Sequence, residues 1–431
     1  MVKKVKSTRA AVVVAAAALC VGTLVACSSG SSDSAASGSS ASAGDTSASA
    51  AGGEYTWWDP YPQHDASSDW EKRVDACGTQ AGVTIKRTAY DTTALTNQAL
   101  LAGQEGSSPD VILLDNPAVS TLADAGILAT MKDISLDTSA FDKNLIAAGE
   151  LGGDTFGIPI GANTLALYYN KTLLDAAGVD PASVKDWASL NAALAKLTAA
   201  GKGGITFSAI GTEEGSFQFL PWFWGAGADL KQLDSPQAVA ALDQWTKWVQ
   251  DKTAPNSVIS NSQNTTWEEF LAGNYAFAEN GTWQVDNAKK APFPTGVIQI
   301  PGQNGGVAPT PTGGEFITVP VQSDTARYEV TKKIVECMTT TDGLVKTGET
   351  FAYYIPSTKA GQDALLAANP DLNTWVAAVQ SAKGRTSDDL GTKYPKISEA
   401  MWTAVQAALS GSATPEQALK DAQTQAEQAT K

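Results

Sequence analysis

Aromatic side chains are the residues of this chain whose types and spacing most suggest a ligand site. The chain contains 12 tryptophans, and positions 217–224 read Phe-Gln-Phe-Leu-Pro-Trp-Phe-Trp. This segment is too aromatic to bury completely in one element, and we expect Pro221 to break it. Sugars need such surfaces, because their C–H faces are apolar while their hydroxyl groups require hydrogen-bond partners. The twelve tryptophans make the aromatic half of such a site plausible.

Polar groups follow the strand that the sequence predicts at 54–58. Trp57 and Trp58 are adjacent, so their side chains point to opposite faces, and we expect one in the core and Trp58 in a ligand site. Asp59 and Gln63 follow in a loop stiffened by prolines. Open α/β sheets bind ligands at the carboxyl ends of their strands, so both side chains are candidate ligand contacts.

A second predicted strand, 111–114, ends in the same way. Asp115 and Asn116 follow it directly, in front of Pro117. Their position at a strand end makes both candidate ligand contacts. Capping of the next helix explains Asn116 equally well.

Three carboxylates, Glu213, Glu214 and Glu315, raise the alternative that the protein is an enzyme. A glycoside hydrolase needs two of them, and Glu213 and Glu315 would then be its acid and nucleophile. No spacing shows that two of the carboxylates face each other. The chain has a single histidine, His64, and lacks a nucleophile elbow, a phosphate loop and a calcium loop. We therefore expect no catalytic residue, no metal and no cofactor.

The first 27 residues have the form of a secretory signal. Four basic residues precede an apolar run at 10–26, which is shorter than the ~20 residues that span a bilayer. The run ends in Leu-Val-Ala-Cys, which resembles a bacterial lipobox, where the chain is cut before the cysteine and the cysteine is acylated. An ordinary signal with a chance cysteine is the alternative. The pattern predicts a lipid on Cys27 that holds the protein outside the cytoplasm, on the membrane surface.

Composition supports a tethered, acidic body. Residues 28–53 are Ser, Ala, Gly and Thr except for two aspartates, which is typical of a flexible linker. Without the four basic residues of the signal, the chain has 26 basic and 45 acidic residues, a formal charge of −19. This charge argues against binding to nucleic acid or to anionic lipid, so the acylated cysteine has to make the membrane contact.

Strands and helices are predicted to alternate through the body, which favours an α/β fold with a parallel sheet covered on both faces. The predicted strands are 54–58, 83–88, 111–114, 164–169, 205–209 and 315–320, and the predicted helices are 65–81, 95–102, 117–125, 189–199, 238–250 and 328–340. Cys77 and Cys337 lie on two of these helices. Outside the cytoplasm a disulfide between them is expected, with two buried thiols as the alternative.

A series of short motifs runs through the body in a fixed order. They are Ser-Pro-Asp-Val-Ile at 108–112, Ala-Asp-Ala-Gly-Ile-Leu at 123–128, Gly-Ile-Pro-Ile at 157–160, Tyr-Tyr-Asn-Lys-Thr-Leu-Leu at 168–174, Asp-Trp at 186–187, Phe-Leu-Ala-Gly-Asn-Tyr-Ala at 270–276, Asn-Gly-Thr-Trp at 280–283 and Tyr-Ile-Pro at 354–356. No single motif is specific. By their order and spacing the chain resembles the extracellular solute-binding proteins of bacterial carbohydrate ABC importers, the family that includes maltose-binding protein.

The resemblance implies a periplasmic-binding-protein-like fold of two α/β lobes, joined by a hinge of crossing strands, with the ligand in the cleft between them. After a signal at 1–26 and a lipidated linker at 27–53, it implies a first lobe of 54–161 plus 318–351 and a second lobe of 162–317 plus 352–431. Cys77 and Cys337 then share a lobe, which favours their bridge. It also implies a monomer that delivers an oligosaccharide to an ABC permease.

The resemblance also implies which aromatic rings stack on the sugar. It places stacking residues within 217–224, where we expect Trp222 and Trp224 to contact the ligand with Phe217 behind them. Trp283, which follows Asn-Gly, matches the stacking tryptophan of the family.

Polar contacts complete the implied site. Asn163 falls where the family often carries a hydrogen-bonding side chain. Gly313 and Gly314 precede a hinge strand that begins at Glu315, and bare glycines let backbone amides approach a ligand. The leading hypothesis is a lipid-anchored oligosaccharide receptor. The alternatives are a surface glycoside hydrolase and an importer receptor for a peptide or another polar solute.

Overall fold

A computed structural model describes residues 54–431 except residue 352, and the backbone but not the side chains of Thr92 and Thr93. The signal, the linker and the lipid site predicted at 1–53, including Cys27, lie outside the described residues. In the part of the chain that is described, none of the helices has the length and apolar character needed to cross a bilayer.

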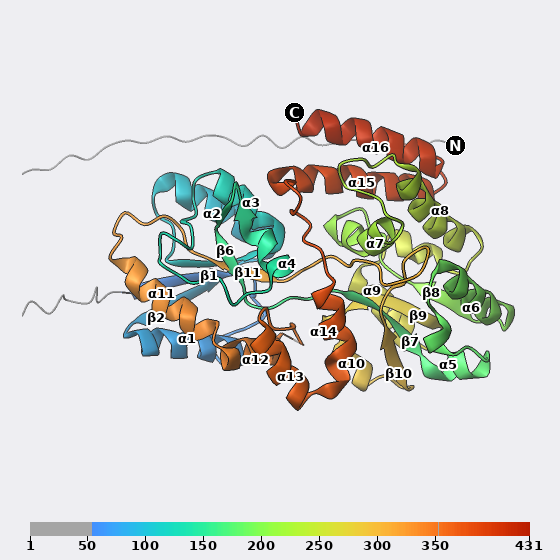
Figure 1. The fold of residues 1–431 in the computed structure, drawn as a ribbon, viewed down its shortest axis with the longest axis horizontal. Helices are drawn as coiled ribbons and strands as arrows, with labels where there is room; N and C mark the ends of the chain where they lie inside the picture. Colours follow the sequence, from blue (N-terminus) through green and yellow to red (C-terminus); the bar gives the residue numbers. More distant parts are fainter. Residues whose placement is uncertain (1–53, 352) are drawn as a thin grey trace, which may run out of the picture. The chain divides into compact units, whose positions relative to one another are not determined.

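The first sheet has the strand order β2-β1-β3-β11-β6 (Figure 1). Strand β1 is parallel to β2 and β3, whereas β11 is antiparallel to β3 and β6. The strands are β1 (Glu54–Asp59), β2 (Thr84–Ala89), β3 (Val111–Asp115), β6 (Gly157–Pro159) and β11 (Glu315–Thr318), and the helices around this sheet are α1 (Asp69–Ala81), α2 (Thr92–Glu105), α3 (Asn116–Asp124), α4 (Lys143–Ile146), α11 (Arg327–Met338) and α12 (Thr341–Thr350). The sheet is therefore mixed and not wholly parallel as predicted.

Both faces of the first sheet are buried. Val111 and Leu113 of β3 join a core cluster with α1 and α11, while Ile112 and Leu114 join another with α2 and α3. Figure 1 shows these two helix pairs on opposite sides of the sheet. This alternation explains why the β3 sequence is apolar throughout. On the first of these faces a disulfide joins Cys77 of α1 to Cys337 of α11, as expected.

The second sheet has the strand order β10-β7-β9-β8. Its strands are β7 (Leu165–Asn170), β8 (Gly203–Thr206), β9 (Tyr275–Gly281) and β10 (Thr295–Ile298). Its helices are α5 (Lys171–Ala176), α6 (Trp187–Ala199), α7 (Glu213–Gly225), α8 (Pro236–Gln250), α9 (Gln263–Leu271), α10 (Val285–Lys289), α13 (Lys359–Ala368), α14 (Asn373–Gln380), α15 (Tyr394–Leu409) and α16 (Pro415–Ala429). Smaller elements are the hairpin β4 (Glu150–Leu151) and β5 (Asp154–Thr155) and the 3₁₀ turns Ala147–Gly149, Pro181–Ser183, Asn256–Ile259, Thr282–Gln284, Pro370–Leu372 and Gly391–Lys393.

Crossing segments join the two sheets. Asn163, between β6 and β7, pairs with Gly313, just before β11, and Ala162 pairs with Ile355. The register of β11 puts Glu315, Phe316 and Ile317 in the first sheet, so the predicted lobe boundary at 317/318 moves to before Glu315. The boundary moves because β11 pairs with β3 over its whole length and with β6 from Phe316 to Thr318.

Helix α7 contradicts one expectation about the aromatic segment. Pro221 does not break it: the helix is continuous from Glu213 to Gly225, and residues 215–224 are all buried. An internal proline costs roughly 3 kcal/mol. Burial of five aromatic rings from this segment offsets that cost, because each buried ring contributes about 1.5–3 kcal/mol.

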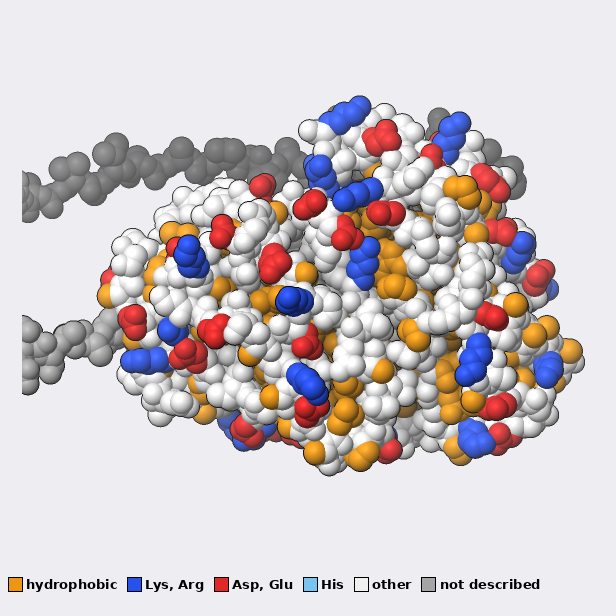
Figure 2. Space-filling view, in the orientation of Figure 1, with side chains coloured by type: hydrophobic (Ala, Val, Ile, Leu, Met, Phe, Trp, Pro, Cys, Tyr) orange, Lys and Arg blue, Asp and Glu red, His pale blue; other side chains and the backbone are white. Residues whose placement is uncertain are grey.

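Figure 2 shows one face of the described residues, on which acidic and basic side chains are interspersed. Several ion pairs join exposed side chains one helical turn apart, such as Lys171 with Asp175 and Lys359 with Asp363. Exposed pairs of this kind add little to stability.

Candidate functional site

A cavity of about 420 Å³ lies where the crossing segments meet. The ends of β3 and β11, the helices α7 and α9, the turn after β9 and the connecting segments line it: Asp115, Asn163, Glu213, Glu214, Phe217, Gln263, Trp283, Gly313, Gly314, Glu315 and Arg385. Asp115 ends β3, and Glu315 begins β11, which is antiparallel to it, so the two residues lie at the same edge of the first sheet. Open sheets bind their ligands at the edge formed by the carboxyl ends of their parallel strands. The size of the cavity is within the range of small-molecule sites. We call this cavity the cleft.

Two aromatic rings line the cleft. Phe217 projects from the second turn of α7, and Trp283 lies just after β9. Their ring centroids are 6.4 Å apart, with the planes inclined by 46°. Phe217 is nearly buried and Trp283 is partly exposed. Together they give one wall of the cleft an apolar surface against which a flat apolar face of a ligand can pack.

Arg385 supplies the positive charge of the cleft. It is buried, and its Nη1 donates to Glu213 Oε1 at 2.7 Å while its Nη2 lies 3.6 Å from Asp115 Oδ1. Burial alone would lower the pKa of Arg385, but the charges of Asp115 and Glu213 raise it. Because Asp115 lies on the first sheet and Glu213 on α7, the guanidinium connects the two sides of the cleft. It also lies 5.0 Å from the centre of the Phe217 ring, within cation–π distance.

Glu213 has its hydrogen bonds filled within the protein. Besides Arg385, Tyr394 Oη donates to it at 2.6 Å, and the Ser398 hydroxyl donates to its other oxygen. Tyr394 and Ser398 lie on α15, so the Glu213 carboxylate links the start of α7 to that helix. Glu213 is consequently a structural anion at the edge of the cleft.

Glu315 has no basic partner among the hydrogen bonds and ion pairs of the described residues. Tyr354 Oη donates to its Oε2 at 2.9 Å. Burial, reinforced by the charge of Asp115, raises the pKa of Glu315 to about 7. Burial also raises the pKa of Asp115, and the charge of Arg385 counteracts this rise. Burial likewise raises the pKa of Glu214, whose carboxylate accepts a hydrogen bond from the Gln263 backbone N–H. Around neutral pH, Glu315 can therefore either donate or accept a hydrogen bond in the cleft.

Five predicted contacts line the cleft together with Gly314: Asp115, Asn163, Phe217, Trp283 and Glu315. Gly314 adopts a φ of +105°, which disfavours any residue with a side chain. Their roles toward a ligand remain predictions.

Other predicted contacts from the first lobe do not line it. Trp58 is half-buried, and the centre of its ring lies 5.3 Å from that of Tyr90 in an edge-to-face arrangement. Asp59 is fully buried, where Arg87 and the indole N–H groups of Trp57 and Trp70 bind its carboxylate. The prediction for Asp59 is corrected, because the protein itself occupies both of its oxygens.

Gln63 and Asn116 also lie outside the lining. Gln63 is exposed in the loop after β1. Asn116 is buried at the start of α3, and its Nδ2 donates to the Thr312 carbonyl and hydroxyl oxygens. The alternative that Asn116 caps the next helix is wrong as well: Asp115 is the N-cap of α3, and its side chain accepts a hydrogen bond from the Asn116 N–H at 2.9 Å.

The expectation that Trp222 and Trp224 face the cleft is corrected as well. Trp222 is fully buried, and its Nε1 donates to Glu279 Oε2 at 2.7 Å. Trp224 is only 6% exposed, and the Lys383 ammonium lies 5.4 Å from its ring centre. The continuous helix explains both positions, since it places these rings in the core of the second lobe. Burial raises the pKa of Glu279 well above its usual range, although the hydrogen bond from Trp222 lowers it.

Sequence reasoning missed Arg385 and Gln263 as lining residues, and it considered Glu213 and Glu214 only as carboxylates of an enzyme. Arg385 follows a glycine in the segment between α14 and α15, without a motif or a helical period. It meets Glu213 across 172 residues of chain. Among the described residues, no group of three His, Cys, Asp or Glu side chains is arranged to hold a metal ion.

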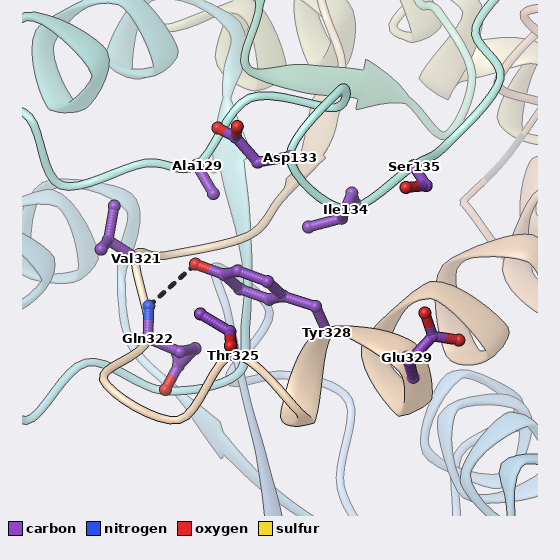
Figure 3. A pocket seen from close by; sticks show the side chains of 9 residues that line it. All are labelled: Ala129, Asp133, Ile134, Ser135, Val321, Gln322, Thr325, Tyr328 and Glu329. Atoms are coloured by element: carbon purple, nitrogen blue, oxygen red, sulfur yellow. Dashed lines mark hydrogen bonds between the residues drawn. The ribbon is translucent and has the colours of Figure 1, made fainter.

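A second hollow, of about 460 Å³, lies in the first lobe near α11 (Figure 3). Its lining includes the ring of Tyr328, which Figure 3 shows across the hollow from Asp133 and Ile134. Tyr328 Oη accepts a hydrogen bond from the Gln322 backbone N–H, and Asp133 accepts bonds from Thr130. Because the lining of this hollow offers one aromatic ring and comes from the first lobe alone, the cleft is the better candidate.

A family model described as bacterial extracellular solute-binding protein matches residues 72–374, more than half of the chain. The chain belongs to this family. Its members are solute-binding proteins and not enzymes, which removes the support for a glycoside hydrolase.

Curated relatives of this solute-binding protein match over part of their length. The maltodextrin-binding protein MdxE of Bacillus subtilis is 27% identical over 242 residues, 50% of this chain and 52% of the relative. A maltooligosaccharide ABC transporter solute-binding lipoprotein of Streptococcus pneumoniae is 25% identical over 290 residues, 63% of this chain and 65% of the relative. The chain thus spans about half to two-thirds of these relatives.

Solved structures match nearly the whole body. The cyclic alpha-maltosyl-1,6-maltose binding protein of Arthrobacter globiformis has a TM-score of 0.75 at 23% identity, with coverage of 88% of this chain and 99% of that one. The GacH receptor of Streptomyces glaucescens has a TM-score of 0.71 at 23% identity, with coverage of 88% and 98%. These likenesses show that the solute-binding protein has the two-lobed periplasmic-binding-protein-like fold that the sequence predicts.

Proposed function

We propose that this solute-binding protein captures oligosaccharides in the cleft and delivers them to an ABC permease. The observation that carries the proposal is that Phe217 and Trp283 line the same cavity as Asp115, Asn163 and Glu315. A pyranose presents apolar C–H faces and a rim of hydroxyl groups. The two aromatic rings of the cleft match the C–H faces, and its carboxyl and amide groups match the hydroxyl groups.

The relatives favour α-glucan oligosaccharides within that class. The two curated relatives reported above are named for maltodextrin and maltooligosaccharide. Each stacked ring contributes roughly 1.5–3 kcal/mol from apolar burial. Two rings with hydroxyl pairing correspond to roughly micromolar affinity after the cost of association.

The proposal includes a lipid on Cys27 that holds the protein on the outer surface of the cell membrane, where it acts as a monomer. The lipobox-like sequence supports it, and the related pneumococcal protein is named a lipoprotein. Growth of the producing cells with labelled palmitate tests this part. A Cys27→Ser variant should lose the label and the membrane attachment, and unchanged attachment would contradict it.

Isothermal titration calorimetry tests the proposed ligand class. We expect maltotriose to bind residues 54–431, which contain every strand and helix described, more tightly than xylotriose, raffinose or a tripeptide. Trp283→Ala should weaken binding at least tenfold. Tyr328→Phe, in the second hollow, is the matched control and should leave it unchanged.

Two results would contradict the proposal. Binding of the tripeptide alone would make the protein a receptor for another solute. Shorter sugars that accumulate in chromatograms of the incubated oligosaccharide would show hydrolysis, which a receptor does not perform.

A further inference from the structure

The indole of Trp283 lies directly over the backbone of Gly281, two residues before it. A Cβ atom at Gly281 would lie 2.0 Å from Trp283 Cζ3, 2.3 Å from Cη2 and 2.4 Å from Cε3. Carbon atoms in contact are normally about 3.5–4.0 Å apart. The six-membered ring of Trp283 therefore occupies the space that any side chain at position 281 would need.

The backbone itself gives no reason for a glycine at this position. Gly281 has a φ of −106° and a ψ of −176°, a conformation that any residue adopts. The contact with the indole is therefore what distinguishes glycine from alanine here.

The peptide beneath the ring is fixed on both sides. The Gly281 N–H donates to Asn280 Oδ1 at 2.9 Å, and Tyr168 Oη donates to the Gly281 carbonyl at 2.9 Å. Asn280 in turn donates from Nδ2 to the carbonyl of Gln263, a residue that lines the cleft. Because this backbone is held in place, a side chain added to it would displace the ring and not the peptide.

We propose that Gly281 is a positioning residue for ligand binding, because its missing side chain sets the depth and tilt at which Trp283 presents its ring to the cleft. The inference rests on the proposed function, since a stacked ligand is what gives the depth of the ring a consequence. A methyl group at this position pushes the indole by about 1 Å or more, which changes its angle to Phe217. The fold tolerates the change, because the clashing atoms belong to a partly exposed side chain.

A double-mutant cycle with maltotriose as the probe tests this role. Gly281→Ala should weaken binding about tenfold or more, while the midpoint of urea unfolding stays near that of the wild type. In a Trp283→Ala background the same substitution should have no further effect. Gly211→Ala is the matched control, because a Cβ there meets its nearest neighbour, Gln406 Cγ, at 3.5 Å, an ordinary contact.

A measurement without ligand separates this inference from the proposed function. With 5-fluorotryptophan incorporated, the ¹⁹F resonance that is missing in Trp283→Ala identifies Trp283. It should shift in Gly281→Ala and stay in place in Gly211→Ala. If the wild type binds no oligosaccharide, the proposed function fails, and this resonance still decides the positioning role.

Three outcomes would overturn the inference. They are an unshifted Trp283 resonance in Gly281→Ala, unchanged maltotriose affinity in that variant, and an equal loss of affinity in the presence and absence of the Trp283 ring.

Discussion

Glu315 of β11 lies directly opposite Asp115 of β3 in the antiparallel register at the edge of the cleft. Directly opposed residues share one face of a sheet, so their carboxyl groups are close neighbours. Arg385 lies beside Asp115, whereas phenol groups surround Glu315. Burial raises the pKa of both carboxyl groups, but Asp115 has a cation beside it that counteracts the rise, whereas the pKa of Glu315 reaches about 7.

The raised pKa of Glu315 predicts a pH-dependent stability. The folded protein holds this proton up to about pH 7, whereas the unfolded chain releases it near its ordinary pKa of 4.5. The contribution of Glu315 to stability is full below pH ~4.5 and is lost as the pH rises through about 7. In urea unfolding, the free energy should fall between pH 5 and 8 by about 1–3 kcal/mol more in the wild type than in Glu315→Gln.

The control for this comparison is Glu416→Gln, which changes an exposed carboxylate on α16. Other buried acids with raised pKa values, such as Glu279, are present in both proteins and cancel in the difference. Equal slopes for the wild type and Glu315→Gln would show that Glu315 is ionised throughout this range.

Trp222 and Trp283, both in the second lobe, should differ in how much their truncation destabilises the protein. Trp222→Ala removes a fully buried ring and leaves Glu279 without its indole donor, so the free energy of unfolding should fall by about 3–5 kcal/mol. Trp283→Ala removes a partly exposed ring and should change it by less than about 1 kcal/mol. Denaturant titration of both variants checks this difference. Equal destabilisation would mean that Trp283 is a core residue and not a ligand surface.

Arg385 should stabilise the structure through the carboxylates that it pairs. Arg385→Gln leaves Glu213 and Asp115 without their cation. Removal of one partner of a fully buried ion pair costs about 3–5 kcal/mol, but the side chains of Glu213 and Asp115 are 35% and 32% exposed, so we expect a loss of about 1–3 kcal/mol. In the double variant Arg385→Gln with Glu213→Gln, the loss should be smaller than the sum of the two single losses. Urea unfolding of the four proteins gives the coupling. Simple additivity would contradict a direct interaction.

The Cys77–Cys337 bridge should contribute to the stability of the first lobe. It joins α1 to α11 across 260 residues of chain. Replacement of both cysteines by serine should lower the free energy of unfolding by about 2–5 kcal/mol. Thiol titration of residues 54–431 under denaturing conditions without reductant should find no free thiol, and two free thiols would exclude the bridge.

The helix α7 shows where sequence reasoning stops. From the sequence, a proline within a run of aromatic residues indicates a broken, exposed segment. The structure has one helix, because packing against β9, α8 and α15 stabilises a segment that would not be helical by its own propensity. Which rings of that helix reach the cleft depends on its orientation, so Phe217 lines the cleft while Trp222 is sealed in the core.

Strand ends were predictable for a complementary reason. The apolar sequence of β3 gives the length of a buried strand, and a polar residue that directly follows such a strand lies at the edge of the sheet where ligands bind. Asp115 could therefore be placed at the cleft. Asp59 ends β1 in a similar way, but Arg87 from the neighbouring strand β2 binds its carboxylate. No local sequence pattern indicates that Arg87 is its partner.

The sequence by itself determined the family, the alternation of strands and helices, and the residues that local position brings to a strand end or a strand-to-helix turn. These properties depend on neighbours within a few residues of each other. Only the tertiary structure decided which tryptophans are sealed, which carboxylates have partners, and that Arg385 joins the two sides of the cleft. These depend on contacts between segments far apart in the chain, such as Arg385 with Glu213, where packing and charge pairing outweigh local preference.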